Sequence, residues 1–184
     1  MSQPFETKAA WEAGRDRLQA AIRDVPDFPK PGILFRDITP ILGDAQLLTL
    51  SVDLMAHQIQ GTVDAIVGIE SRGFLFGIPL AMRLGVGFVP VRKPGKLPAA
   101  TREVRYALEY GEDALQIHTD ALAAGQRALV VDDLLATGGT ARATCDLVEA
   151  CGARVAGCAF LIELAALSGR GRLGDIPATT VITY

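Results

Sequence analysis

Two adjacent acidic residues lie between a strand-like run and a loop of very small residues, and this order constrains the fold more than any other feature. The run from Arg127 to Val131 is apolar after its first residue and ends in two β-branched valines, which is typical of a central parallel strand. Asp132 and Asp133 follow, then alanine, threonine and glycine, and a helix is expected from about residue 139. The order strand, loop, helix predicts a βα unit of an α/β protein, with the loop at the carboxyl end of its strand.

The loop after the two acids has the composition of an anion-binding site. Small residues let several backbone N–H groups converge on one anion, and the following helix N-terminus adds the positive end of its dipole. Two carboxylates would repel a bare phosphate, but they accept hydrogen bonds from paired sugar hydroxyls, so a phosphorylated sugar suits both halves of the motif. The residues predicted to hold it are Asp132, Asp133, Ala136, Thr137, Gly138, Gly139 and Thr140. The alternative is an ordinary strand–turn–helix junction, which needs one Asp as N-cap and no glycine pair.

Composition limits the class of protein. The 184 residues fit one domain, or one domain with a small appendage, and a hydrophobic content of 49% is ample for a core. No apolar run approaches the roughly 20 residues of a membrane span, and charged residues near the N-terminus argue against a signal peptide. A net charge of −3 gives no basic surface for nucleic acid. Cys145, Cys151 and Cys158 are odd in number and lack CxxC spacing, so we expect reduced thiols in a cytoplasmic protein and no metal site.

Hydrophobic periodicity predicts that strands alternate with helices along most of the chain. Besides the unit above, helices are expected over residues 6–24, 44–60 and 72–84, and strands over 63–69, 86–91, 104–110, 115–118, 154–163 and 179–183. Three prolines exclude a helix from residues 26–32, and residues 92–103 and 168–174 are expected to be loops. The alternation predicts an α/β fold with a doubly wound, mostly parallel sheet that binds its ligand beyond the carboxyl ends of the strands.

A second candidate site opens the helix predicted over residues 72–84. Ser71 and the neighbouring glycines can expose backbone N–H groups, and Arg72 offers two parallel donors to a diphosphate. Because this segment also follows a predicted strand, we expect it at the same edge of the sheet as the two acids. The alternative is that Arg72 pairs with Glu70 or lies in solvent.

A short basic run follows the strand predicted over residues 86–91. It places Arg92, Lys93 and Lys96 within five positions, in a loop interrupted by proline and glycine. A charge run of this kind is commonly a solvated surface. Its place after a core strand instead favours a mobile lid that brings positive charge to a polyanion and keeps water from a reactive centre.

The central stretch, Val130 to Thr140, resembles the signature with which type I phosphoribosyltransferases bind 5-phosphoribosyl pyrophosphate (PRPP). The segments similar to the adenine branch of that family are residues 27–38, 70–74, 92–98 and 106–111, in this order. The resemblance extends from about residue 20 to the C-terminus. It implies an enzyme of purine salvage that transfers the phosphoribosyl group of PRPP to adenine, giving AMP and pyrophosphate. It also implies Mg²⁺ held mainly through the substrate, and a homodimer.

The resemblance also implies how the chain is divided. Residues 1–40 would form an N-terminal helix and a hood over the base, and residues 41–184 a PRPP-binding core with a mobile lid at 92–110. In the hood, Leu34, Phe35 and Arg36 would bind adenine, their backbone reading its edge and an apolar side chain packing near its face. Plain core packing of Phe35 is the alternative.

The remaining implied roles concern the diphosphate and the chemistry. The residues expected to bind pyrophosphate are Ser71, Arg72, Arg92, Lys93 and Lys96, and Arg72 and Glu109 are expected to be catalytic. Glu109 would act as acid or base, since an apolar strand end raises the pKa of a carboxyl toward the working pH. A surface strand glutamate is the alternative at that position.

Two other functions remain open from the sequence. A phosphoribosyltransferase for another purine, such as hypoxanthine or xanthine, would share the PRPP loop and differ in the hood. A PRPP-sensing regulator without catalysis would share it too, although such a protein usually carries a nucleic-acid-binding extension or a basic face, which this acidic chain lacks.

Overall fold

The structure is a computed structural model that describes all residues except 1–4, 6 and 108–111. The helices are α1 (Lys8–Ala21), α2 (Thr39–Gly43), α3 (Ala45–Gln58), α4 (Arg72–Leu84), α5 (Gly139–Ala150) and α6 (Arg170–Leu173), with a 3-10 turn η1 (Ala165–Leu167). The strands are β1 (Arg23–Pro26), β2 (Leu34–Asp37), β3 (Ala65–Ile69), β4 (Gly87–Val91), β5 (Thr101–Ala107), β6 (Glu112–His118), β7 (Arg127–Leu135), β8 (Arg154–Glu163) and β9 (Ala178–Thr183).

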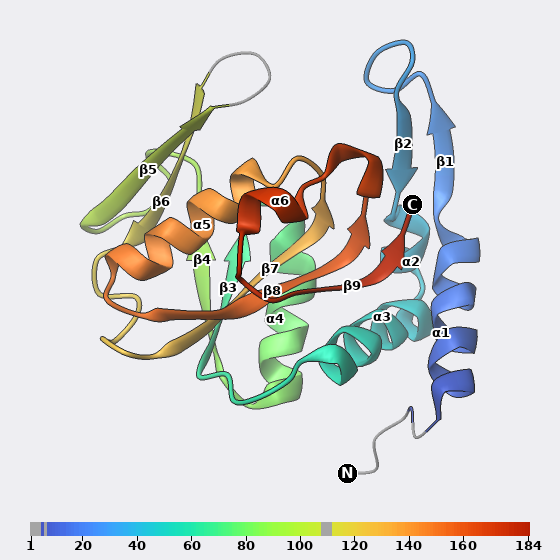
Figure 1. The fold of residues 1–184 in the computed structure, drawn as a ribbon, viewed down its shortest axis with the longest axis horizontal. Coiled ribbons are helices and arrows are strands. Elements are labelled where there is room, and N and C mark those ends of the chain that lie inside the picture. The colour runs from blue at the N-terminus through green and yellow to red at the C-terminus, as the bar shows by residue number, and fades with distance from the viewer. Residues whose placement is uncertain (1–4, 6, 108–111) are drawn as a thin grey trace.

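A five-stranded parallel sheet forms the centre of the protein. Its order is β4-β3-β7-β8-β9, and every neighbouring pair is parallel. Strand β3 is buried along its whole length, as expected of a strand covered on both faces. Figure 1 shows α3 and α4 on one side of the sheet and α5 on the other. This arrangement confirms the predicted α/β fold.

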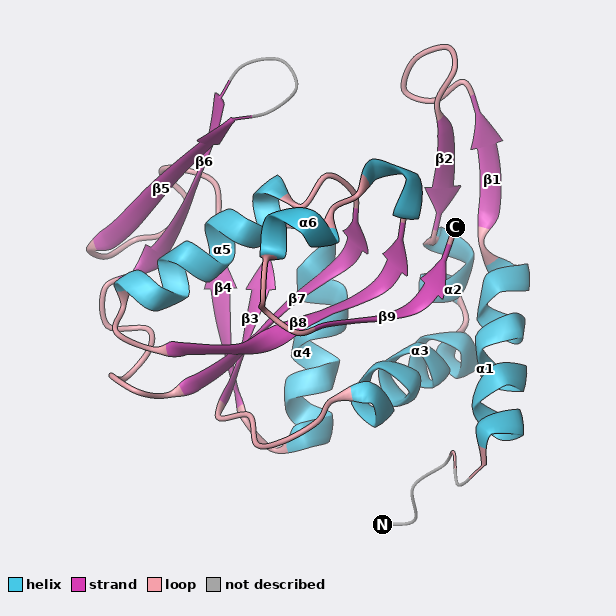
Figure 2. Cartoon of the chain, viewed as in Figure 1, coloured by secondary structure: helices cyan, strands magenta, loops and turns pink. Residues whose placement is uncertain are grey.

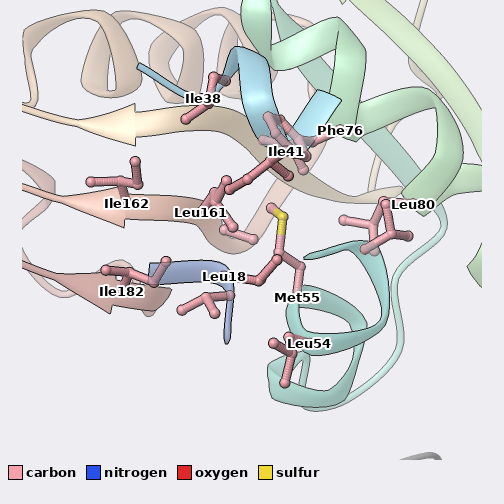
Figure 3. Packing of buried hydrophobic residues seen from close by; sticks show 14 of the residues in the cluster. Leu18, Ile38, Ile41, Leu54, Met55, Phe76, Leu80, Leu161, Ile162 and Ile182 are labelled. Atoms are coloured by element: carbon pink, nitrogen blue, oxygen red, sulfur yellow. The ribbon is translucent and has the colours of Figure 1, made fainter. Parts of the chain in front are cut away.

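Alternation along β7 supplies both faces of the sheet with core residues. Leu129 and Val131 face the cluster that contains α1, α3 and α4, while Ala128 and Val130 face the cluster that contains α5 and β6. Figure 3 shows part of the first cluster, in which side chains from helices and from β8 and β9 meet. The sheet is therefore fixed between two apolar layers, and its carboxyl edge is a rigid platform.

Two antiparallel hairpins stand outside the central sheet. Strands β1 and β2 form one and strands β5 and β6 the other. Both project from the same end of the molecule, the end toward which the arrows of β3, β7 and β8 point (Figure 2). The parts of the chain that the sequence assigns to hood and lid thus flank the predicted ligand edge.

Several predicted boundaries hold. Helix α3 begins after Asp44, whose carboxylate accepts hydrogen bonds from the backbone N–H groups of Gln46 and Leu47. Helix α4 and strand β8 have the predicted ends. The three cysteines are free thiols, Cys145 and Cys158 buried and Cys151 half-buried.

Other boundaries were wrong. The first helix ends at Ala21, because the chain continues as hairpin strand β1, which the sequence analysis did not predict. The expected loop at 92–103 already becomes strand at Thr101, because β5 pairs with β6 along seven residues. The expected loop at 168–174 contains the short helix α6. Among the helices of the described residues, none has both the length and the apolar character needed to cross a bilayer.

Candidate active site

The two acids lie within strand β7, near its carboxyl end, and not in a loop after it. The strand extends to Leu135, so the predicted end at residue 131 was wrong, because Asp132 and Leu134 still pair with β8. Helix α4 lies directly against this strand end. A Cβ on Gly73 would lie 2.7 Å from the carbonyl oxygen of Val131 and 3.0 Å from Oδ1 of Asp132, so only glycine permits this approach.

The acids, Arg72 and the small-residue loop line one cavity of about 190 Å³. Asp133 is 4% exposed, and its Oδ2 lies 2.9 Å from Nε of Arg72. Arg72 therefore pairs with Asp133, not with Glu70 as the alternative had it. The predicted sugar-phosphate residues that line this cavity are Asp132, Asp133, Ala136, Thr137, Gly138, Gly139 and Thr140.

Burial makes the two carboxyl groups hard to ionise together. Burial, together with the neighbouring charge of Asp133, raises the pKa of Asp132 well above its ordinary value. Burial also raises the pKa of Asp133, although the charge of Arg72 opposes this. The pair is thus prepared for a ligand that brings positive charge or hydrogen-bond donors.

The loop between β7 and α5 has the backbone of an anion cradle. Gly138 has φ +81°, a left-handed conformation that favours glycine, and it directly precedes the twelve-residue helix α5. The helix dipole therefore points at the cavity. The Thr140 hydroxyl lies 3.4 Å from the hydroxyl of Tyr106 on β5, which connects the loop to the β5–β6 hairpin.

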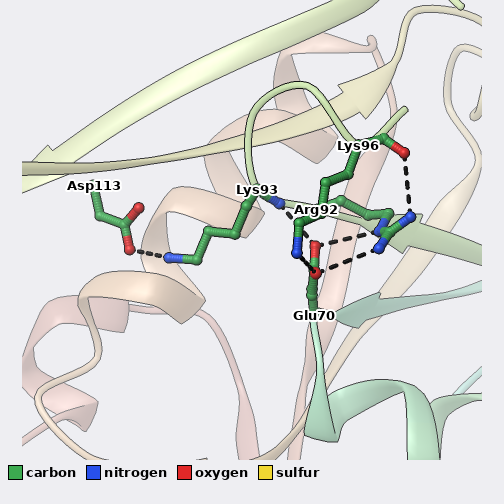
Figure 4. A network of polar contacts seen from close by, with 5 residues as sticks. All are labelled: Glu70, Arg92, Lys93, Lys96 and Asp113. Carbon is green, nitrogen blue, oxygen red and sulfur yellow. Dashed lines mark hydrogen bonds and ion pairs between the residues drawn. The ribbon is translucent and has the colours of Figure 1, made fainter. Parts of the chain in front are cut away.

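The basic run is gathered around one carboxylate (Figure 4). Oε1 of Glu70 lies 2.6 Å from Nζ of Lys96, and Oε2 accepts hydrogen bonds from Arg92 Nε at 3.2 Å and the Lys93 N–H at 3.0 Å. Burial alone would raise the pKa of Glu70, but these hydrogen bonds, with the charge of Arg92, lower it to about 2. Glu70 therefore stays ionised and holds the loop beside the cavity.

Lys93 binds a different acid. Its ammonium group pairs with Asp113 on β6, and Asp113 also accepts a hydrogen bond of 3.1 Å from the Tyr106 hydroxyl. The hydrogen bond from Lys93 is the main reason that the pKa of Asp113 is lowered. All three cations of the run thus have carboxylate partners, and they are not a freely solvated surface.

A second cavity, of about 510 Å³, lies between the hood and α4. It is lined by Val25, Phe28, Phe35, Asp37, Ile38, Thr39, Leu42, Arg72 and Leu75. The rings of Phe28 and Phe35 meet edge to face with centroids 5.1 Å apart, and the Arg72 guanidinium lies 5.7 Å from the Phe35 centroid. Arg72 lines both cavities, so the polar and the apolar site adjoin.

The other two hood residues face away from this cavity, because side chains alternate along β2. Leu34 is 46% exposed. Arg36 pairs with Asp24 and places its guanidinium 3.7 Å from the centroid of the Tyr184 ring. Of the three predicted residues, only Phe35 contributes a side chain to the cavity, which leaves backbone contacts for Leu34 and Arg36.

Some functional candidates were missed and one cannot be placed. Asp113 and Tyr106 were given no role, because their partners come from distant segments, although Tyr106 belongs to a segment that resembles the family. Ser71 is exposed at the start of α4 and forms no side-chain cap. Glu109 lies outside the described residues. Among the residues that are described, no group of three or more potential metal ligands occurs.

Comparison with known proteins gives this geometry its context. A family model for the phosphoribosyl transferase domain matches residues 44–176. The adenine phosphoribosyltransferase of Rippkaea orientalis is 58% identical over 170 residues, which cover 91% of this chain and 99% of that protein. The chain belongs to the adenine phosphoribosyltransferase family.

Solved structures of this family have the same fold. The crystal structure of adenine phosphoribosyltransferase from Thermoanaerobacter pseudethanolicus aligns with a TM-score of 0.90 at 52% identity, covering 92% of this chain and 99% of that one. The Saccharomyces cerevisiae adenine phosphoribosyltransferase, complexed with an imino-altritol bisphosphate and adenine, aligns with a TM-score of 0.87 at 42% identity, again covering 92% and 99%. The resemblance read from the sequence is confirmed.

Proposed function

We propose that this protein transfers the 5-phosphoribosyl group of PRPP to adenine, giving AMP and pyrophosphate for purine salvage. The observation that carries the proposal is that Arg72 lines both cavities. A polar cavity suited to a phosphorylated sugar thereby adjoins an apolar cavity suited to a planar base. A sugar and a base held in these two sites meet at the carbon where the bond forms, which is the main requirement of a group-transfer reaction.

On the sugar side, the loop 136–140 binds the 5-phosphate through backbone N–H groups and threonine hydroxyls. Asp132 and Asp133 accept hydrogen bonds from the ribose hydroxyls. As pyrophosphate leaves, positive charge develops at the ribosyl carbon, and the two nearby carboxylates stabilise it. Ser71, Arg72 and the basic run Arg92, Lys93 and Lys96 hold the departing pyrophosphate.

On the base side, Phe35 packs against the purine, and the backbone of Leu34 and Arg36 recognises its edge. A carbonyl accepts a hydrogen bond from the 6-amino group of adenine, whereas it faces another acceptor in a 6-oxo purine. Glu109 is the proposed acid or base, acting near N7 of the purine. Nitrogen N9 attacks the ribosyl carbon as the bond to pyrophosphate breaks.

Mg²⁺ is the proposed cofactor, bound mainly to substrate oxygens. The two carboxylates at the end of β7 fit an ion that takes one or two protein ligands and completes its shell with phosphate and water. When bound, the ion neutralises negative charge on the leaving pyrophosphate.

We also propose that the protein acts as a homodimer in the cytoplasm. The exposed face of α4 carries Leu75, Ile78 and Met82 at helical spacing, with 45%, 46% and 79% exposure, which suits a covered surface. The functional division into a hood at 1–40 and a core at 41–184 with a lid at 92–110 belongs to the same proposal. Reduced thiols support the cytoplasmic location.

The test is an assay of purified protein with PRPP, Mg²⁺ and one of three bases. Adenine is expected to give AMP and an equal amount of pyrophosphate. Hypoxanthine and xanthine are expected to give no nucleotide and no pyrophosphate. If a 6-oxo purine were turned over in preference to adenine, the assignment of adenine as the substrate would be wrong. Binding of PRPP without turnover of any base would instead favour the regulator.

A further inference from the structure

The backbone of the phosphate-binding loop packs closely against the backbone of the segment that follows β8. A Cβ on Gly138 would lie 2.3 Å from the carbonyl oxygen of Gly169, and a Cβ on Gly169 would lie 2.2 Å from the carbonyl oxygen of Ala136. Both distances are far inside van der Waals contact. Gly169 has φ −59° and ψ −29°, which any residue adopts, so only the close approach requires glycine there.

The far side of this segment is fixed to the sheet by a buried carboxylate. Arg170 donates from Nε and Nη2 to the two oxygens of Glu163, each at 2.8 Å, and from Nη1 to the carbonyl oxygen of Ala178 at 2.6 Å. The Glu163 side chain is 8% exposed at the end of β8, and Thr180 donates to it at 3.1 Å. The Arg170 side chain is 47% exposed, but its partner carboxylate is buried and the pair is bidentate, so it restrains Arg170 more than an ion pair between two exposed groups would.

The loop 136–140 needs such support, because alanine, threonine and glycine provide few side chains to hold it. A backbone wall on one side fixes where its N–H groups point, and those groups must meet a phosphate within a fraction of an ångström. The wall is formed by Gly169, and Arg170 with Glu163 fixes the wall to β8 and β9.

We propose that Gly169 and the Arg170–Glu163 ion pair are positioning residues for the phosphate-binding loop, setting its affinity for the 5-phosphate end of PRPP without touching the substrate. The inference rests on the proposed function, since it assigns that loop to the phosphate.

The test compares Gly169→Ala with Gly171→Ala. Gly169 directly precedes α6 and Gly171 lies within it, and a Cβ on Gly171 would meet nothing within 4 Å. Gly169→Ala must displace the loop by about 1 Å, so KM for PRPP is expected to rise by about ten- to a hundredfold while KM for adenine stays unchanged. Calorimetry with ribose 5-phosphate should show the same loss without turnover. Gly171→Ala should match the wild type in all three.

A second pair of variants covers the case in which Gly169→Ala does not fold. Arg170→Met is expected to raise KM for PRPP, and Arg170→Lys, which keeps one contact to Glu163, to recover part of the affinity. The inference is overturned if Gly169→Ala or Arg170→Met keeps wild-type affinity for PRPP, or loses affinity for PRPP and adenine equally. Failure of the proposed function would appear differently, as wild-type protein without adenine-dependent pyrophosphate release.

Discussion

Asp132 occupies a position in which the fold disfavours a charged group. Its burial and the charge of Asp133 raise its pKa above the ordinary 3.8. As the pH rises from that value through the raised pKa, the unfolded chain loses the proton while the folded protein keeps it. The free energy of unfolding therefore decreases over this range and stays reduced above it. A residue retained at such a disadvantage is typical of a functional site.

We therefore expect Asp132→Asn to stabilise the protein while it weakens PRPP binding. The melting temperature should exceed that of the wild type, by about 2–4 °C for each kcal/mol gained in a domain of this size. The difference should grow as the pH rises from about 4, near the ordinary pKa of the group, through the raised pKa of the folded protein. Thermal unfolding across this range measures it, with exposed Asp120→Asn as the neutral control. If the variant melted at a lower temperature than the wild type at pH 8, the ionised Asp132 side chain would not destabilise the folded protein as argued.

Glu70 is the counter-ion of Arg92 and Lys96, and with a pKa of about 2 it is charged at every working pH. A bound pyrophosphate must share these cations with it and is repelled by its charge. Glu70→Gln is therefore expected to strengthen product inhibition by pyrophosphate about tenfold, the equivalent of roughly 1.4 kcal/mol. Inhibition kinetics measure this, with Glu149→Gln, which removes an exposed partner of Arg142, as control. Weaker inhibition would mean that Glu70 organises the cations more than it competes for them.

Side chains alternate along strand β2, so neighbouring residues of the strand have different surroundings. Phe35 lines the apolar cavity, and Leu34 on the opposite face is exposed. Phe35→Ala should raise KM for adenine by about ten- to a hundredfold, since stacking of a base on an aromatic ring contributes about 1–3 kcal/mol. Leu34→Ala keeps the backbone and should leave that KM unchanged. Steady-state kinetics with adenine as the varied substrate compare the two, and a larger effect at Leu34 would reverse the assignment.

The elements that were predicted well are those whose pattern is local. Helix α4 and strand β8 follow from apolar periodicity, and α3 begins at an Asp that caps it. Hairpin strand β1 was missed because it is four exposed or half-exposed residues long, so no apolar pattern marks it. The predicted end of strand β7 was four residues too early. Acidic residues are uncommon inside a buried strand, but here the pairing with β8 continues through them.

The exposed apolar stripe on α4, formed by Leu75, Ile78 and Met82, is the surface proposed to be covered in the assembled protein. A second copy of the chain is its proposed occupant. Met82→Asp places a charge at the most exposed position of the stripe and should convert a dimer to a monomer in light scattering. Leu167→Asp changes an exposed apolar residue elsewhere and should leave the mass unchanged. A wild-type monomer, or a Met82→Asp dimer, would contradict the proposed surface.

The site as a whole was predictable in its chemistry and not in its pairings. The βα loop and Arg72 were placed at one edge because parallel strands bring their carboxyl ends together. That Arg72 pairs with Asp133, that Glu70 gathers the basic run, and that Gly169 supports the loop all depend on contacts between distant segments. Periodicity and local motifs carry no information about such contacts.

The central claim is that the acids at the end of β7 and the loop after them hold PRPP. Calorimetric titration of the protein with PRPP and Mg²⁺, in the absence of adenine, tests it most directly. Saturable heat at one site per chain is expected from the wild type, and clearly weaker binding from Asp132→Asn that is folded and at least as stable. Absence of heat from the wild type, or undiminished binding by the variant, would contradict the claim.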